Sequence, residues 1–325
     1  MNFAERHWYR LSIVSILLAP LSLLFRALVS LRRALYRAGL LRQVRLPVPV
    51  IIVGNLTVGG TGKTPLVLWL AEELRRRDRR PGILCRGYGG RERGPRAVTG
   101  GDTPSLTGDE ALLLAERARC PVFIGADRSA AGLALLAAHP ECDIIVCDDG
   151  LQHYRLQRDL EIGVEDERGL GNRLLLPAGP LREPASRKVD ATVVNGGEPG
   201  AGAYSMRLRA SGMYRVSGPQ EAVEPSELRG RRLHAVAAIG NPQRFFAELT
   251  RMGLTAVPHS FPDHYAYRAE DLEFPDCDIV LMTEKDAVKC RRFGRRDLVA
   301  VRVDAQTDPA FAELIWSRID GRAPA

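Results

Sequence analysis

The sequence lacks any arrangement of cysteines that would indicate a disulfide framework. Its six cysteines, spread between positions 85 and 290 of a 325-residue chain, form no CxxC pair and no dense cluster. Cys85, Cys142 and Cys147 lie in or beside apolar runs, where buried free thiols are the usual state. These features exclude a small disulfide-stapled secreted protein and favour a reducing compartment.

Outside its first 46 residues the chain also lacks net charge. The whole sequence carries 46 basic and 39 acidic residues, but residues 1–46 hold eight arginines against a single acid, Glu5. The remaining part, 47–325, therefore contains 38 residues of each sign. A protein that coats nucleic acid needs a basic surface on its folded domain, so nucleic acid is not expected as a partner. The sequence indicates no obligate protein partner either.

Charge is entirely absent from residues 11–25, which read LSIVSILLAPLSLLF. These fifteen residues are fewer than the roughly 20 that a helix needs to cross a bilayer. Polar residues recur on one narrow helical stripe, which predicts a helix lying in a membrane interface, with arginines toward lipid phosphates and leucines in the acyl region. The stripe consists of Ser15, Ser22, Arg26, Ser30, Arg33 and Arg37. A spanning helix, a cleaved signal peptide and a helix in the protein's own core remain alternatives.

Strand-like and helix-like segments alternate through the rest of the chain. Uncharged, β-branched runs at 47–55, 82–85 and 143–147 are separated by helical patterns, which predicts an α/β fold with a parallel sheet and helices on both faces. A second series begins near residue 204, after a glycine-rich stretch. We therefore expect an N-terminal membrane-associated helix with its basic flank (1–46), a larger domain (47–200) and a smaller α/β domain (201–325) that closes over a substrate cleft.

The end of the first strand carries the clearest chemical motif. Residues 54–65 read GNLTVGGTGKTP, so a strand is followed by a glycine-rich turn, Gly-Lys-Thr and a helix. In such a phosphate loop, backbone amides converge on nucleotide phosphates, the lysine supplies positive charge and the threonine hydroxyl binds Mg²⁺. The fold is thus predicted to be of the P-loop NTPase type, with ATP and Mg²⁺ as cofactors. The expected phosphate-binding residues are Thr57, Val58, Gly59, Gly60, Thr61, Gly62, Lys63 and Thr64.

A P-loop site needs a second metal contact, and the run DIIVCDD at 143–149 supplies candidates. Asp148 and Asp149 follow an apolar strand, where side-chain alternation sends neighbouring carboxylates in opposite directions. At most one of them is expected to contact the metal directly, and we favour Asp148. Thr64 completes this set.

A kinase also needs a group that accepts the proton of the attacking hydroxyl. Spacing alone does not distinguish among Asp109, His153, His259 and His264. Each of them is also compatible with an ordinary role as a helix cap, a surface residue or a core histidine.

Taken together, the motifs resemble those of tetraacyldisaccharide 4'-kinase, the lipid A pathway enzyme of Gram-negative bacteria. The resemblance runs from residue 54 to residue 289 in unbroken order, and the N-terminal apolar helix agrees with it. DDGLQHYRLQRDL after a GGTGKTP loop is its most specific part. The matching segments are GNLTVGGTGKTP (54–65), CRGYGG (85–90), TGDEALLLA (107–115), IGADR (124–128), DDGLQHYRLQRDLEI (148–162), LLPAGPLREP (175–184), AAIGNPQRFF (237–246), FPDHYAY (261–267) and MTEKDAVK (282–289).

The resemblance implies transfer of the ATP γ-phosphate to the 4' hydroxyl of a tetraacyl glucosamine disaccharide 1-phosphate, giving lipid IVA. It also implies that Asp109 and His264 form the proposed base, with Lys63 as a further catalytic group. Arg128 falls on a nucleotide-binding position, and Glu183 falls among the metal-site positions with the aspartate pair. A substrate with four acyl chains implies work at an anionic membrane surface, on the cytoplasmic face of the inner membrane.

Two other classes share parts of this pattern. A membrane-anchored switch ATPase of the partition type would have a lysine before the glycine pair, where this chain has Val58. A GTP-binding module would need an N-K-x-D-like string, and the nearest one, TEKD at 283–286, lacks the asparagine.

Overall fold

The computed structural model describes residues 7–319. Its strands are β1 (Val50–Gly54), β2 (Pro81–Cys85), β3 (Arg96–Ala97), β4 (Val122–Ile124), β5 (Ile144–Asp148), β6 (Leu160–Asp166), β7 (Ala191–Asn195), β8 (Ala203–Arg215), β9 (Gly218–Ala222), β10 (Leu233–Ala237), β11 (Ala256–Ser260), β12 (Ile279–Thr283) and β13 (Leu298–Thr307). The α-helices are α2 (Ile13–Arg37), α3 (Lys63–Arg76), α4 (Pro104–Thr107), α5 (Asp109–Arg117), α6 (Arg128–Ala138), α7 (Pro242–Arg251), α8 (Glu284–Cys290) and α9 (Pro309–Ile319). Short 3₁₀ helices occupy Pro225–Leu228, Glu270–Leu272 and Arg291–Phe293.

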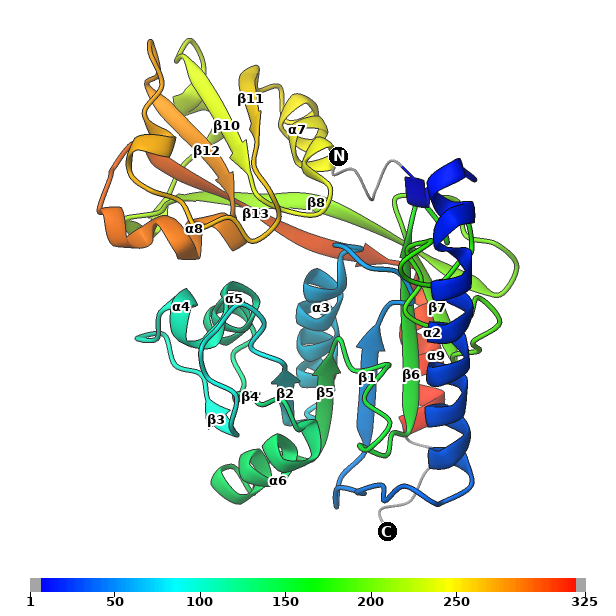
Figure 1. Cartoon of the computed structure of the whole chain (residues 1–325). Helices are drawn as coiled ribbons and strands as arrows, with labels where there is room; N and C mark the ends of the chain where they lie inside the picture. The colour runs from blue at the N-terminus through cyan, green and yellow to red at the C-terminus, as the bar shows by residue number, and fades with distance from the viewer. Residues whose placement is uncertain (1–6, 320–325) are drawn as a thin grey trace.

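All thirteen strands of this described part join one mixed sheet (Figure 1). Their order is β11-β10-β12-β13-β8-β7-β6-β1-β5-β2-β4-β3, with β9 paired to β8. The pairs that surround β1, β5 and β2 are parallel, and so are those around β10 and β12. The predicted α/β fold with a mostly parallel sheet is therefore confirmed.

Alternation along β1 shows why helices cover both faces of the sheet. Ile51 and Val53 pack in one apolar core with α3, α5 and α9, whereas Val50 and Ile52 pack in the opposite core with α6. A strand that is buried on both faces is expected to be uncharged throughout. The same alternation recurs in β10, whose Ala235 packs toward α7 while Val236 packs toward α8.

The chain forms two lobes (Figure 1). The P-loop lobe is built on β1–β7 with α3–α6, and the second lobe is built on β10–β12 with α7 and α8. The long strands β8 and β13 pair antiparallel from Met206 with Thr307 to Arg215 with Val299, and they pass from one lobe into the other (Figure 1). Helix α9 then packs back on the P-loop lobe, where Phe311 stacks on Trp69 of α3. Helix α9, which follows the second lobe in sequence, therefore completes the core of the first lobe.

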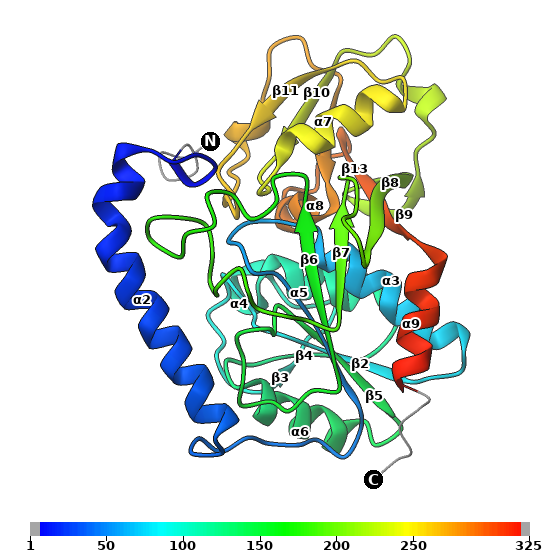
Figure 2. The same ribbon diagram turned by 90° about the vertical axis from the view of Figure 1, so that its right-hand side faces the viewer.

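Helix α2 lies along the outer edge of the P-loop lobe (Figure 2), and two serines of its polar stripe have partners that the sequence did not predict. Ser15 and Ser22 of the polar stripe face the protein rather than lipid, with exposed fractions of 1% and 5%. The Ser22 hydroxyl donates to the carbonyl oxygen of Leu175 at 2.7 Å. The apolar side chains of the opposite face are exposed: Ile13, Ile16, Leu17, Leu21, Leu23, Leu24, Leu28 and Leu31.

Two further sequence predictions concern this helix and the cysteines. By length and composition, α2 is the one helix of the described residues that could cross a membrane. All six cysteines are free, and Cys85, Cys142 and Cys147 are buried, as the sequence predicts. Burial raises the pKa of the Cys85 thiol well above its usual range, so this sulfur is a packing group rather than a nucleophile.

Candidate active site

The loop between β1 and α3 has the backbone geometry of a phosphate site. Gly59 and Gly62 adopt φ angles of +101° and +97°, which favour glycine. A Cβ atom on Gly62 would lie 2.4 Å from Nδ2 of Asn195, which donates to the Thr61 carbonyl oxygen at 2.9 Å. Helix α3 begins at Lys63 without a side-chain cap, so its first amide groups are free to bind an anion.

Lys63 points toward the acidic strand end next to the loop. Its Nζ donates to Oδ1 of Asn55 at 3.0 Å and lies 3.6 Å from Oδ1 of Asp149. The side chain is 13% exposed, which leaves its ammonium accessible to a phosphate oxygen while neighbouring groups orient it.

The two adjacent aspartates at the end of β5 have different environments. Asp149, with φ +50°, accepts from Nη1 of Arg182 through both carboxylate oxygens at 2.9 and 2.8 Å. Desolvation opposes its ionisation, but Lys63 and Arg182 hold the pKa of Asp149 below its usual range. Asp148 is only 3% exposed, and its Oδ1 has no hydrogen-bond partner.

Burial, and then the negative charge of Glu110, raise the pKa of Asp148 to about 7. A buried carboxylate without a cationic partner at its free oxygen suits a hard cation. Mg²⁺ commonly takes one or two carboxylates plus substrate phosphates rather than a full protein cage. No group of three or more His, Cys, Asp or Glu side chains among residues 7–319 could hold a metal by itself. These features of Asp148 fit a site for Mg²⁺.

The structure brings Asp109 and His264 together from different lobes. Asp109 opens α5 in the P-loop lobe, whereas His264 lies in the loop after β11. The Nδ1 atom of His264 lies 3.1 Å from both carboxylate oxygens of Asp109. Desolvation opposes both charges, but their hydrogen bond lowers the pKa of Asp109 and raises the pKa of His264. Because Asp109 holds Nδ1, Nε2 is the ring nitrogen that could accept a proton from a substrate.

The other two histidine candidates lie in different settings. His153 accepts from the backbone amide of Arg128 through Nε2 at 3.1 Å. Burial and the Arg128 charge lower the pKa of His153 to about 4. His259, in the edge strand β11, stacks on His234 and Phe274. Of the candidates, only His264 pairs with Asp109.

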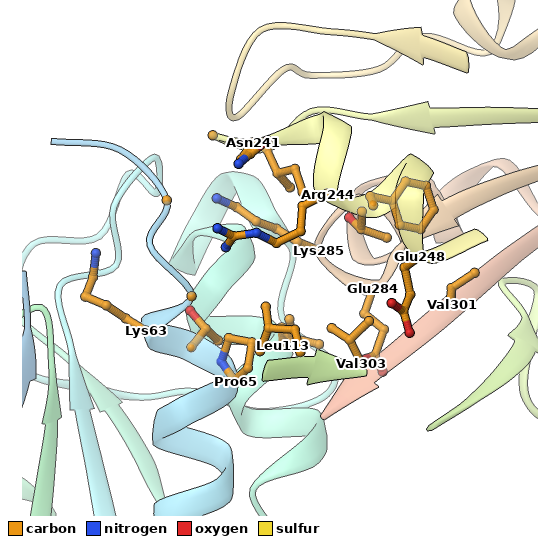
Figure 3. A pocket seen from close by; sticks show the side chains of 18 of the residues that line it. Lys63, Pro65, Leu113, Asn241, Arg244, Glu248, Glu284, Lys285, Val301 and Val303 are labelled. Carbon is orange, nitrogen blue, oxygen red and sulfur yellow. The ribbon is translucent and has the colours of Figure 1, made fainter. Parts of the chain in front are cut away.

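Two cavities meet at the phosphate loop. The larger one, of about 680 Å³, is lined by Lys63, Arg128, Asp148, Asp149, His153 and His264. The second, of about 180 Å³, lies between the lobes and has largely apolar walls that include Leu68, Leu113, Phe245 and Val303. Gly60, Lys63 and Glu110 line both. Figure 3 shows the second cavity, with Arg244 and Lys285 extending from the second lobe toward the side where Lys63 lies.

Comparison with known proteins agrees with this geometry. A family model described as tetraacyldisaccharide-1-P 4'-kinase matches residues 14–320. The chain belongs to this family. It is 53% identical over 334 residues to the tetraacyldisaccharide 4'-kinase of Azoarcus sp. strain BH72, with 100% of this chain and 98% of that protein covered. Identity to the enzyme of the same name from Methylobacillus flagellatus is 51%, covering 98% and 96%.

A solved structure of the family has the same fold. The crystal structure of LpxK from Aquifex aeolicus in complex with ATP superposes with a TM-score of 0.80 at 32% identity, covering 94% of this chain and 100% of that one. The family assignment therefore rests on the fold as well as on the sequence.

One metal-site residue expected from the family resemblance lies elsewhere. Glu183 has no exposed surface and does not line either cavity. Its carboxylate accepts from Nε2 of Gln152 at 3.0 Å, from the Tyr154 hydroxyl and from Nε of Arg187 at 3.2 Å. Two of these donors, Gln152 and Tyr154, lie in the loop that follows Asp149. We therefore correct its expected role from metal ligand to support of the aspartate loop.

Arg128 and Thr57 take their places around the loop in different ways. Arg128, 3% exposed, donates through Nη1 to the Gly125 carbonyl oxygen at 2.6 Å, and its Nε has no partner. Thr57 is buried and forms a β-bridge to Leu181. Thr57 thus joins the phosphate loop to the segment around Leu181. Arg128 instead lines the larger cavity.

Sequence reasoning missed several groups that the fold brings to this site. Asn195 orients the phosphate loop, and Glu110 lines both cavities. Arg182, which the family resemblance places at the active site, binds Asp149. Lys285 also lies here: its segment, MTEKDAVK, is part of the family resemblance, but the sequence assigned no role to the lysine. A polar residue directly after an apolar strand, as at Asn195, was the available signal.

Proposed function

We propose that this protein transfers the γ-phosphoryl group of ATP to the 4' hydroxyl of a tetraacyl glucosamine disaccharide 1-phosphate. The observation that carries the proposal is one cavity that gathers a phosphate-loop lysine, a buried carboxylate with a free oxygen and a carboxylate-bound histidine. These are the parts that phosphoryl transfer to an alcohol requires.

Each group has a distinct task in this reaction. The backbone amides of the loop and Lys63 bind the nucleotide phosphates, and Mg²⁺ at Asp148 and Thr64 would neutralise charge on them. His264 accepts the proton of the attacking hydroxyl at Nε2. Asp109 holds the opposite nitrogen, which fixes the tautomer and orients the ring. The apolar cavity between the lobes is suited to the nucleotide base, and the wider cavity is suited to the sugar headgroup.

The lipid substrate also accounts for α2. Removing an acyl chain from a bilayer costs about 0.8 kcal/mol per CH₂ group, so the enzyme has to approach the membrane. The exposed leucines of α2 suit insertion into the acyl region, and Arg32 of the same helix lines the cavity that contains His264. We place the protein on the cytoplasmic face of the inner membrane, where ATP is available and anionic lipid attracts the arginines of residues 26–45.

A transfer assay tests the proposal. The full chain is incubated with γ-labelled ATP, Mg²⁺ and a detergent-solubilised tetraacyl disaccharide 1-phosphate, with a water-soluble glucosamine disaccharide in parallel. We expect label in the lipid, and a loss of roughly 10²–10³ in turnover for Lys63→Ala. Lys188→Ala is the matched control, because Lys188 is exposed and lines neither cavity. Release of label as inorganic phosphate only would instead indicate a switch ATPase.

A further inference from the structure

Lys285 is a partly buried cation that lines the cavity between the lobes and contacts residues of the larger cavity. It lies in the first turn of α8, and its side chain is 15% exposed. It lines the cavity between the lobes together with Lys63 and Thr64 (Figure 3). Lys285 belongs neither to the phosphate loop nor to the Asp109–His264 pair, so the roles described above do not include it.

The partners of Lys285 come from both lobes. Its Nζ donates to Oε1 of Glu110 at 3.0 Å and to Oδ1 of Asp263 at 3.3 Å. It also lies 3.4 Å from Nε2 of His264, the ring nitrogen opposite the one that Asp109 holds. Burial opposes its charge, but Glu110, Asp109 and Asp263 raise the pKa of Lys285 above its usual range. The side chain is therefore an ammonium at neutral pH.

This position coincides with the place of phosphoryl transfer. The acceptor hydroxyl must reach Nε2 of His264 to lose its proton, and the phosphates must lie at the loop that contains Lys63. The transferred phosphoryl group then lies between them, in line with the attacking and leaving oxygens. An ammonium that contacts Nε2 and lines the nucleotide cavity is adjacent to that group.

We propose that Lys285 is a catalytic residue that donates a hydrogen bond to a non-bridging oxygen of the transferred phosphoryl group. The inference rests on the kinase activity proposed above. In moving from Nε2 to the phosphoryl oxygen, Lys285 also frees the base. The hydroxyl oxygen forms the new bond to phosphorus, its proton passes to Nε2, and the bond from phosphorus to the β–γ bridging oxygen breaks to release ADP. Lys285 keeps its proton throughout, and its charge stabilises the oxygens of the transition state.

The first test separates contact with the transferred group from a structural ion pair between the lobes. Lys285→Met, Lys285→Arg and the control Lys188→Met are compared for kcat and for binding of ADP and of a non-hydrolysable ATP analogue. We expect Lys285→Met to lose roughly 10²–10³ in kcat, to bind the analogue several-fold more weakly and to bind ADP normally. Lys285→Arg should recover part of the loss. Equal weakening of ADP and analogue binding, or kcat within a few-fold of the unsubstituted protein, would overturn the proposal.

The pH profile gives a second readout. The charged groups around His264 are Asp109, Asp263 and Lys285, and the lysine lowers the pKa of His264 while the acids raise it. Because the base acts only when neutral, Lys285→Met should shift the acid limb of kcat to higher pH. An unshifted limb contradicts contact with the base. If the unsubstituted protein phosphorylates no lipid, the proposed function fails, and the comparison of ADP with the ATP analogue alone decides the role of Lys285.

Discussion

Asp148 and Asp149 are adjacent in sequence, yet their carboxylates meet different partners. Asp148 ends β5 in extended backbone and keeps a buried oxygen free, whereas the turn at Asp149 directs its carboxylate to Arg182 and Lys63. Deleting one charge at each position therefore removes different interactions. At Asp148 it would remove the proposed metal ligand, and at Asp149 it would remove the partner of Arg182 and Lys63.

We expect Asp148→Asn to raise the Mg²⁺ concentration needed for half-maximal activity more than Asp149→Asn does. The substitutions are isosteric and matched, so each serves as control for the other. Magnesium titrations of phosphate transfer, at saturating ATP, measure the difference. The reverse order would show that Asp149 leaves Arg182 to bind the metal, and it would contradict our assignment.

Among elements, α2 shows that the sequence specifies the faces of a helix but not the partners of its polar residues. The sequence predicts a helix with one polar stripe and one apolar face, and both exist. Ser22 turns inward because its hydroxyl satisfies the Leu175 carbonyl oxygen, a partner 153 positions away that no local pattern reveals. The inward serines hold α2 against the P-loop lobe, so the exposed leucines form a face with a fixed orientation.

Replacing Leu17, Leu21 and Leu24 by serine should release the protein from anionic lipid vesicles, because their exposed fractions are 74%, 55% and 59% and their transfer into lipid favours binding. Flotation measures the bound fraction. Ala27→Ser, on an exposed position of the same helix, is the control and should float normally. ATP binding should persist in both variants. Flotation of the triple variant at the normal level would mean that this face does not contact lipid.

The strands and the phosphate loop were predictable because their signals are local. Uncharged runs specify buried strands, and GGTGKT specifies Lys63 and Thr64 whatever the distant chain does. The long β8–β13 pair and the return of α9 to Trp69 were not predictable, because partner choice between remote strands depends on the whole topology. The place of Lys285 at the site was not predictable for the same reason, since its partner Glu110 lies 175 positions away.

At the scale of the whole molecule, ion pairs hold the two lobes together beside the catalytic pair. Arg117 of α5 binds Glu284 of α8 at 2.7 Å, and Arg291 binds Glu116 at 2.5 Å. At the phosphate loop, a Cβ atom on Gly240 would lie 2.5 Å from the Gly60 amide nitrogen, so only glycine permits this approach. These contacts keep α5 against α8, and Asp109 thereby stays within hydrogen-bond distance of His264.

Asp109 and His264 should therefore act as one unit across the lobe interface. A positioned base contributes about 10²–10⁴-fold to rate, and we expect Asp109→Ala, His264→Ala and the double variant to lose similar amounts of kcat, because groups that act together are non-additive. Asp109→Ala removes the anion that raises the pKa of His264, so its residual activity should show an acid limb at lower pH. His259→Ala, a histidine of the same lobe outside both cavities, is the control and should keep normal kcat. Losses that simply multiply, or a lower melting temperature with unchanged kcat, would reduce the contact to a structural bond between lobes.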